Sequence, residues 1–413
     1  MKEKHNPNSQ KRLRRRDTCR SWTELPIDIL ISVLERLNSP NFKRAKSVCL
    51  SWYSASRQCV PNPKYHISWL VPFPKDRNNN LRTLFNPEEK HKRYNTQDLG
   101  VGFANSVCIA TCGSWLLMQD PLYNLYIVNL FTRERSDLPS LESQLGMLKV
   151  ERIIDERFRI SHDTVRVKSN GMTIQSAVFW IDEKTKDYIV FWGLRDWCVV
   201  YAKKGDTSWN QIPNTSYCSH MVYKDHKLYF LNNDGGFKII DFSHEIPQRI
   251  LKRGMFRSRL EMARRPSRNN KLGGLWLCRR VESTDYWVFS DPKLVVTVRG
   301  NVLKVIMKQH NMSNEWSFSV TNIYKSSGRI KKYKRVDSLG DEAMLLDLGI
   351  TEPSCEIDGL NGNSIYFSGC HGRPKTKGIF IFNLETKTLE QLHKYDCSSL
   401  KLDGSLVLSS YQV

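Results

Sequence analysis

The chain has 413 residues, of which 40% are hydrophobic and 25% charged, a balance typical of globular rather than disordered or fibrous proteins. This length favours one large domain accompanied by a small one. No apolar run reaches about 18 residues, so the sequence predicts no membrane span. Residues 1–20 are polar and basic, unlike a secretory signal, and we therefore expect a protein of the nucleus or cytoplasm. In a reducing compartment the 11 scattered cysteines are expected to be small buried hydrophobic residues.

The net charge of +21 is concentrated in three segments. Residues 1–20 carry eight Lys or Arg against two acids, residues 252–280 carry ten against one, and residues 325–335 carry six against none. The rest of the chain is neutral as a whole. Any electrostatic attraction of an acidic partner is therefore expected at these segments.

Residues 1–20 are predicted to form a disordered basic arm, because almost no hydrophobic residue occurs there. Its basic run is typical of a nuclear-import signal or a weak nucleic-acid contact. A solvated tail without a partner is the alternative. The candidate import residues are Lys11, Arg12, Arg14, Arg15 and Arg16.

Residues 21–62 are predicted to form a small helical module. Apolar residues at 30, 33, 34 and 37 follow the helical period, with Pro26 in the first turn and a stop at residues 38–40. A second apolar stripe begins at Phe42, and Ser51 is expected to cap a short helix that starts near Trp52. Three short helices bury little surface among themselves, so the module is expected to share apolar contacts with the downstream domain or with another protein.

The apolar residues of this module resemble an F-box, the helical motif that docks on the SKP-type adaptor of SCF (SKP, cullin, F-box) ubiquitin ligases. The sequence departs from the common F-box pattern at Asn41, Lys43 and Tyr53. The resemblance implies binding to a SKP-type adaptor and, through it, to cullin. The residues it implies for adaptor binding are Leu25, Pro26, Ile29, Leu30, Val33, Leu34, Leu37, Val48, Cys49 and Trp52.

Residues 100–413 are predicted to form a β-propeller, and residues 63–99 a linker or its first strands. Short β-type segments separated by turns recur as a loose unit of about 40 to 50 residues, at residues 106–139, 220–242 and 355–392. The third copy is expected to begin with a strand at residues 355–359. Six or seven blades fit the available length, the fit is poorest at residues 140–175, and a pair of β-sandwiches is the alternative.

The C-terminal segments 338–346, 358–367 and 378–380 resemble the KIB-type β-propeller domain that follows the F-box in a large group of plant proteins. The fold expected for the whole chain is therefore a small all-α F-box module followed by a large all-β domain. The resemblance implies a propeller with an unassigned substrate, in a plant.

Catalytic and metal-binding motifs are weak in this sequence, so we expect no enzyme activity, cofactor or metal. Cys108 and Cys112 are four residues apart and are expected on one face of a strand as core residues. Cys370-His371 is expected in a loop without an orienting acid, and Asp341-Glu342 as a solvated or turn-capping pair.

The basic segment 252–280 contains Pro266 and Gly273-Gly274 and is predicted to be a loop between strands. Such a loop suits an acidic protein partner or a nucleic-acid backbone, and a solvated loop without a partner is the bland alternative. Its candidate residues are Arg257, Arg259, Arg264, Arg265 and Arg268.

Two functions follow from these patterns. In the first, the chain is the substrate-recognition adaptor of an SCF-type E3 ubiquitin ligase and its propeller binds a target protein. In the second, it is a basic propeller scaffold that associates with nucleic acid or acidic proteins without a ligase. Salt distinguishes them, because phosphate binding weakens steeply with ionic strength and an apolar interface does not.

Overall fold

The computed structural model describes two compact units, Met1–Tyr65 and His66–Val413, and each is treated by itself. The residues it describes are 25–37, 42, 44–59, 69–71, 83–85, 93–95, 101–130, 132–154, 157–162, 164–194, 196–233, 236–255, 275–277, 287–310, 315–324, 334–355, 360–371, 376–394 and 407–409. In these ranges no helix has both the length and the apolar composition to cross a membrane.

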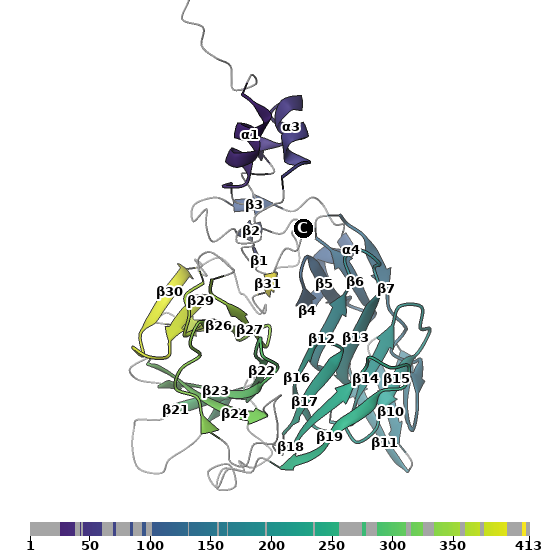
Figure 1. Ribbon diagram of the computed structural model, residues 1–413. Helices are drawn as coiled ribbons and strands as arrows, with labels where there is room; N and C mark the ends of the chain where they lie inside the picture. The colour runs from purple at the N-terminus through teal and green to yellow at the C-terminus, as the bar shows by residue number, and fades with distance from the viewer. Residues whose placement is uncertain are drawn as a thin grey trace, which may run out of the picture. The chain divides into compact units, whose positions relative to one another are not determined.

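The first unit contains α1 (Ile27–Leu34) and α3 (Leu50–Ser56), which pack against each other (Figure 1). The N–H groups of Ile29 and Leu30 donate to the carbonyl of Pro26. Pro26 is therefore the N-cap residue, one position before the first turn in which the sequence predicts it. The expectation for Ser51 is wrong. The cap position of α3 is Cys49, whose backbone is extended, and Ser51 lies inside the first turn.

The second unit is built from sheets of three or more strands in which most neighbouring strands run antiparallel. The strands of most sheets follow one another in the sequence. One such sheet follows the short helix α4 (Val101–Ala104). The three regular four-strand runs are β4 (Val107–Cys112), β5 (Trp115–Gln119), β6 (Leu125–Asn129) and β7 (Arg135–Asp137); β12 (Ile174–Ile181), β13 (Tyr188–Leu194), β14 (Cys198–Lys203) and β15 (Trp209–Ile212); and β16 (Cys218–Lys224), β17 (Lys227–Asn232), β18 (Gly236–Asp241) and β19 (Gln248–Met255).

The C-terminal half forms one continuous eleven-stranded sheet that contains two further blades. One is β22 (Lys293–Val296), β23 (Val302–His310), β24 (Trp316–Tyr324) and β25 (Lys334–Arg335), with β20 (Leu275–Leu277) and β21 (Trp287–Ser290) added beside β23. The other is β26 (Glu342–Leu345), β27 (Ile350–Pro353), β28 (Ser364–His371), β29 (Thr376–Asn383) and β30 (Leu389–Lys394).

The third sequence copy differs from its prediction at its first strand. Cys355 lies in a turn, and residues 356–359 are outside the described residues. The strand beside β28 is β26, and the two run parallel. A β26–β27 hairpin therefore replaces the simple meander, and its β27 pairs with β22 of the preceding blade.

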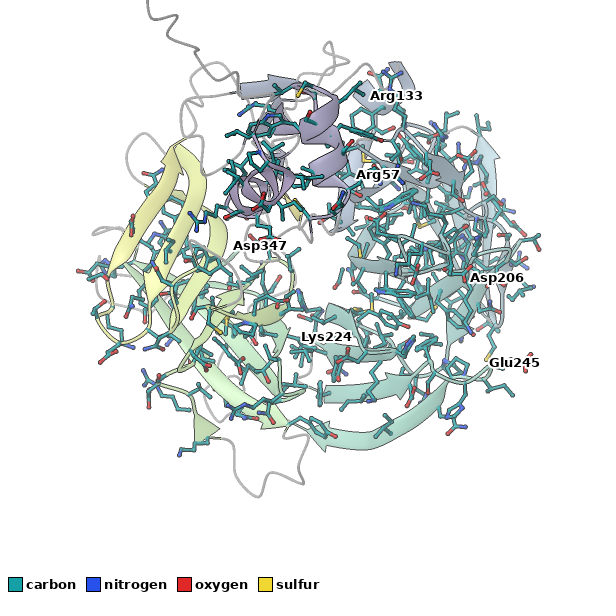
Figure 2. The ribbon with its side chains drawn as sticks, turned by 45° about the horizontal axis from the view of Figure 1, so that its top comes forward. Arg57, Arg133, Asp206, Lys224, Glu245 and Asp347 are labelled. Atoms are coloured by element: carbon teal, nitrogen blue, oxygen red, sulfur yellow. The ribbon has the colours of Figure 1, made fainter. Side chains whose placement is uncertain are left out.

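Strands from both ends of the second unit close the ring. The sheet order is β3-β2-β1-β31, with β1 (Trp69–Val71), β2 (Thr83–Phe85), β3 (Arg93–Asn95) and β31 (Val407–Ser409). The strands β31, β4, β12, β16 and β22 lie next to one another in that order, and β27 follows β22 (Figures 1 and 2). Within the described strands this arrangement is a β-propeller of six blades.

Neighbouring blades share their cores, as blades that cannot cover their own faces require. Phe191 and Phe230, both fully buried, belong to one cluster formed by β12–β15 and β16–β19. Trp316 and Phe367 lie 5.1 Å apart between β24 and β28, in the cluster shared by the last two blades. Each blade is therefore stable only against its neighbours.

A six-residue turn recurs on three blades and begins with Asn129, Asp182 or Asn383. In each, the first residue donates its N–H to the carbonyl of the sixth and accepts from the N–H of the fifth. The first side chain also accepts a backbone N–H further along the turn, as Asn and Asp do. The fifth residue has positive φ and is basic in all three turns, namely Arg133, Lys186 and Lys387.

The stretch that fits the repeat least well, residues 140–175, forms a separate element. β8 (Gln144–Leu145) adds to the outer edge of β15, and β9 (Leu148–Ile154), β10 (Arg157–His162) and β11 (Val165–Asn170) form a three-stranded antiparallel sheet. We call β9–β11 the insertion sheet. Its side chains share one core cluster with the two blades that precede and follow it.

Phe158 of β10 anchors the insertion sheet. It is fully buried, meets the Tyr123 ring edge-on at 5.5 Å, and lies under the Arg152 guanidinium. Tyr123 belongs to the β5–β6 turn, so this contact joins the insertion sheet to the propeller. Gly171, after β11, has φ +78, and a Cβ there would lie 2.4 Å from the Tyr123 hydroxyl oxygen.

Changing Phe158 to Ala should lower the free energy of unfolding by about 3–5 kcal/mol, because it removes a buried aromatic ring and leaves a cavity. Chemical denaturation followed by tryptophan fluorescence measures this. Val165→Ala, at a side chain that is 48% exposed, is the matched control and should change stability by less than about 0.5 kcal/mol. Equal effects would contradict the anchoring role.

Candidate adaptor-docking surface and polar sites of the propeller

The ten residues proposed for adaptor binding divide by burial. Leu30, Leu34 and Trp52 are at most 8% exposed and form the core of the helical module with Ala45, Ala55 and Cys59. Leu25, Val33, Leu37 and Cys49 are half-buried against that core. Pro26, Ile29 and Val48 are exposed, Ile29 by 46% and Val48 by 61%. Three of the ten therefore face solvent, and three hold the module together.

Three further apolar side chains face solvent and were missed by the sequence reasoning. Leu50 is 83% exposed, Tyr53 50% and Ile27 46%. Leu50, Tyr53 and Arg57 follow a spacing of three and four residues along α3, so they share the helix face opposite Trp52 and Ala55. The signal was the helical period itself: once Trp52 faces inward, Leu50 and Tyr53 must face outward.

The module thus has its own core and an unusual amount of exposed apolar surface for a short segment. Exposed apolar side chains in this density mark a protein interaction site. The exposed charged side chains among the module's described residues are Arg36, Arg44, Lys46 and Arg57 against Asp28 and Glu35. The surface is suited to a partner with apolar pockets.

Cys59 has a structural role after α3. Its thiol donates to the carbonyls of Ala55 and Ile31, at 3.2 and 3.8 Å, and so links the end of α3 to α1. Burial, with Glu35 adding to it, raises the pKa of the Cys59 thiol. The sulfur is therefore kept protonated at neutral pH and is not a reactive nucleophile.

Leu34→Ala should destabilise the helical module by about 2–5 kcal/mol, whereas Leu50→Ala should change its stability by less than about 0.5 kcal/mol, because only Leu34 is buried. Hydrogen exchange of the α1 and α3 amides, read by mass spectrometry on the full chain, measures both. A large loss of protection in the Leu50 variant would contradict the assignment of Leu50 to the outer surface.

In the propeller, the expectation that Cys108 and Cys112 share a face is wrong. The register of β4 against β5 shifts between Cys108 and Ala110, which marks a β-bulge. Cys108 pairs with Met118 and Cys112 with Trp115, and those partners lie an odd number of residues apart on β5. The two cysteines therefore lie on opposite faces.

The other sequence candidates are placed in structural roles or within strands. Cys370 and His371 are the last residues of β28 and do not lie in a loop. Glu342 accepts a hydrogen bond from the Thr351 hydroxyl, and the same oxygen of Thr351 accepts the N–H of Val298. Among the described residues no group of three or more His, Cys, Asp or Glu side chains is arranged to hold a metal ion.

Three cysteines inside the propeller, Cys112, Cys198 and Cys218, are protonated. Burial raises the pKa of the Cys112 thiol to about 11, despite a hydrogen bond from the Ile181 backbone. Burial also raises the pKa values of Cys198 and Cys218 to about 12. Because the thiolate is the reactive form, these three side chains behave as small hydrophobic residues.

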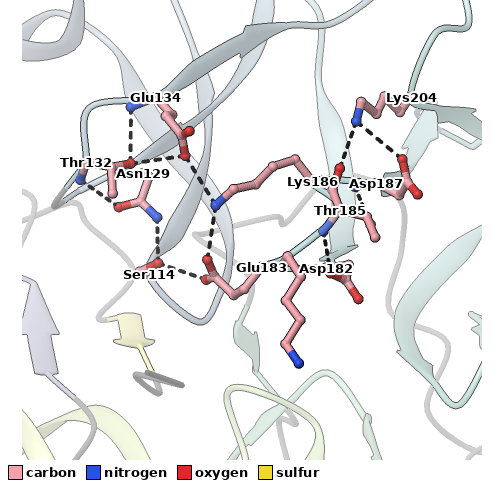
Figure 3. Close-up of polar contacts among 11 residues, drawn as sticks. Ser114, Asn129, Thr132, Glu134, Asp182, Glu183, Thr185, Lys186, Asp187 and Lys204 are labelled. Carbon is pink, nitrogen blue, oxygen red and sulfur yellow. Dashed lines mark hydrogen bonds and ion pairs between the residues drawn. The ribbon is translucent and has the colours of Figure 1, made fainter. Parts of the chain in front are cut away.

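A polar network joins the turns of two adjacent blades (Figure 3). Asn129 donates to the Ser114 hydroxyl at 2.7 Å, and Ser114 donates to Glu183 at 3.0 Å. Lys186 lies 3.2 Å from Glu134 and 3.5 Å from Glu183. The network fixes the β4–β7 blade against the β12–β15 blade through two copies of the recurrent turn.

A second cross-blade network surrounds His220 of β16. Its Nδ1 accepts the N–H of Leu294 on β22, at 3.1 Å. Lys293 pairs with Asp347 at 2.6 Å, and Asp347, labelled in Figure 2, also accepts the N–H of Ser368 on β28 at 2.7 Å. The turn that carries Asp347 lies close to β16, because a Cβ added at Gly349 would lie 2.5 Å from the Val222 side chain.

His220 is neutral in the folded protein. Burial, and then the Lys293 charge, lower the pKa of its imidazole to about 3, and Asp347 opposes the shift only in part. A neutral ring is required for Nδ1 to accept the Leu294 N–H. The network therefore loses one of its links when His220 is protonated.

The lowered pKa predicts a loss of stability in acid. The unfolded chain binds a proton at His220 below about pH 6.5, whereas the folded protein does not until about pH 3, so stability falls between these values. The full slope is about 1.4 kcal/mol per pH unit. Since the side chain keeps some contact with solvent, we expect about 1 kcal/mol between pH 7 and pH 5.

The measurement is the free energy of unfolding in urea at pH 7 and pH 5 for the wild type and for His220→Asn, which keeps an acceptor but does not titrate. The wild type should lose about 1 kcal/mol more than the variant. Parallel losses in both proteins would contradict a neutral His220.

Two sets of sequence candidates lie outside the described residues. They are the import residues Lys11, Arg12, Arg14, Arg15 and Arg16, and the basic-loop residues Arg257, Arg259, Arg264, Arg265 and Arg268. Both remain predictions.

Comparison with known proteins agrees with the two-unit architecture. The F-box domain matches residues 22–64, and the KIB1-4 beta-propeller matches residues 84–383. The chain belongs to the KIB1-4 beta-propeller family. "Putative F-box protein At4g22180" of Arabidopsis thaliana is 53% identical, over 98% of this chain and 97% of its own length. "Probable F-box protein At4g22165", also of Arabidopsis thaliana, is 50% identical over 97% of this chain and 96% of its own length.

Solved structures resemble the chain more distantly. The WD40 domain of SCAP from fission yeast is 9% identical over 79% of this chain and 84% of that chain, with a TM-score of 0.30. The propeller assignment therefore depends on the family match and on the strand pairing.

The match places an F-box at the helical module and a KIB1-4 propeller at the all-β unit. The solvent-facing residues Pro26, Ile29, Val48, Leu50 and Tyr53 all belong to the F-box match. The insertion sheet and the His220 network belong to the KIB1-4 propeller.

Proposed function

We propose that this protein is the substrate-recognition subunit of an SCF-type E3 ubiquitin ligase. Its F-box docks on a SKP-type adaptor, and through it on cullin, while the propeller holds a target protein for ubiquitination. The observation that supports this most is the pairing of an F-box that has its own apolar core and exposed apolar side chains with a KIB1-4 propeller on the same chain.

The energetics of the F-box favour docking. Ile27, Ile29, Val48, Leu50 and Tyr53 are 46–83% exposed, and burying such side chains stabilises a complex by about 1.5–3 kcal/mol each when burial is complete. Trp52 and Leu34 pack inside and are already buried. The adaptor thus gains its contacts from side chains that the folded module leaves free.

In this proposal the chain carries out no bond chemistry. It binds two partners at separate surfaces, and the target's lysine is thereby held close to the ubiquitin-transferring machinery. Tethering converts a rare bimolecular encounter into an effectively intramolecular one. The protein acts in the nucleus or cytoplasm in this proposal, where these partners work.

The test is direct binding of the full chain to a purified plant SKP-type adaptor by biolayer interferometry. Ile29→Glu with Val48→Glu should weaken binding at least tenfold, because charge at exposed apolar positions prevents burial. Binding of the wild type should change little between 0.1 and 0.5 M salt, as expected for an apolar interface.

The matched control is Ile246→Glu with Val298→Glu, the same change at exposed apolar residues of the propeller, 76% and 45% exposed. It should leave adaptor binding unchanged. Absence of binding by the wild type, or equal losses in the two double variants, would refute the docking assignment.

A further inference from the structure

The insertion sheet has one face against the propeller and one face toward solvent. Leu148 and Val150 of β9 and Phe158 and Ile160 of β10 are at most 3% exposed and pack in the core cluster of the neighbouring blades. Residues that alternate with these on each strand must lie on the opposite face. That opposite face is the outer face.

The outer face is strongly basic. The register places Lys149, Ser161 and Arg166 in one cross-strand row and Glu151, Arg159 and Lys168 in the next. A third row contains Ile154, Arg157 and Asn170. Five basic side chains and one acidic side chain give this face a net charge of +4. The basic ones are Lys149, Arg157, Arg159, Arg166 and Lys168, and the acidic one is Glu151.

Most of this charge is unneutralised by the described residues. Glu151 lies 3.2 Å from Arg159, so the one carboxylate of the face is already used. Within the described ranges no ion pair joins Lys149, Arg157, Arg166 or Lys168. An anionic partner therefore meets four cations that no described carboxylate pairs with.

The sheet also offers an edge. In the strand order β11-β10-β9, β11 is the terminal strand and has β10 as its one neighbour among the described strands. Arg166 and Lys168 are exposed on the outer face of β11, and Val165 is 48% exposed on the other. A terminal strand presents backbone N–H and C=O groups that pair with an added extended chain.

Contacts with the propeller hold the insertion sheet in place without a partner. Arg152 of β9 pairs with Glu142 at 2.5 Å and donates to the Leu122 carbonyl at 2.8 Å, while Phe158 packs on Tyr123. His162, at the end of β10, lies beside the Trp197 ring at 5.8 Å. A rigid surface loses little conformational entropy on binding.

We propose that the insertion sheet binds an acidic, extended segment of the target protein, which adds beside β11 as a fourth strand. Acidic side chains at every second residue of the added segment lie beside Arg166 and Lys168. The residues between them lie beside Val165 and Val167. This inference rests on the proposed ligase function only in assigning the acidic segment to a ubiquitination target.

The composition of the outer face favours an acidic peptide over nucleic acid. Its described residues are Lys, Arg, Glu, Ser, Asn and the exposed Ile154, with no aromatic side chain on which a base stacks. Alternation of charge and valine along β11 also matches the two-residue period of a β-strand, which a phosphate backbone does not have.

The test is fluorescence anisotropy with the full chain and the labelled peptide Ac-EVETEVE-NH2, which alternates acidic and smaller residues. We expect binding that weakens with salt and that falls at least tenfold in Arg166→Glu with Lys168→Glu. The rearranged peptide Ac-EEEEVTV-NH2 has the same composition and charge without the alternation, and it should bind at least fivefold more weakly. The matched control Lys184→Glu with Lys387→Glu, at exposed turn residues elsewhere on the propeller, should bind the alternating peptide as the wild type does.

Adaptor binding is measured on the same preparations. If the adaptor binds but the peptide does not, this inference fails while the ligase function stands; if the peptide binds but the adaptor does not, the reverse holds. Equal binding of the two peptides, or equal losses in the two double variants, would overturn strand addition at β11. Tighter binding of a single-stranded oligonucleotide than of the alternating peptide would also overturn it.

Discussion

Burial of apolar sheet faces between neighbouring blades is the interaction on which the propeller depends. Phe191 of one blade and Phe230 of the next share one cluster, and Trp316 and Phe367 pack across the last two blades. Because neighbouring blades cover each other's apolar faces, the first and last blades must also be joined. The pairing of β1 with β31 does this, because it places strands from both ends of the propeller in one sheet.

Polar contacts then set how neighbouring blades meet. The Ser114–Asn129–Glu183 chain works through the recurrent turn, and His220 works through a neutral imidazole between β16 and β22. Both networks link neighbouring blades. Breaking either one would leave partly buried donors and acceptors without hydrogen bonds, which costs stability. Their chemistry is used to hold the ring, and the buried cysteines with raised pKa values are likewise structural.

The two candidate interaction surfaces differ in chemistry. The F-box presents apolar side chains that its small core cannot cover, which suits a stable, salt-resistant contact with an adaptor. The insertion sheet presents cations and a strand edge, which suits a salt-sensitive contact with an acidic segment of a target. In the proposed function, the contact to the ligase is durable and the contact to targets is exchangeable.

Much of this protein followed from sequence alone. The helical period at residues 30–37, the repeated strand–turn units and the F-box and KIB-type resemblances were local patterns, and the family match confirms the fold class they indicated. Only the tertiary structure decided which F-box residues face solvent, because Trp52 and Leu50 are equally apolar and differ only in what packs on them. The basic face of the insertion sheet was equally hidden: Asp155, Glu156 and Asp163 lie between its strands in the sequence and mask the charge of the segment, whereas the strand period gathers five cations on one face. Charge counted along a chain does not show which side of a sheet it reaches, and that is settled by register and by which face the core covers.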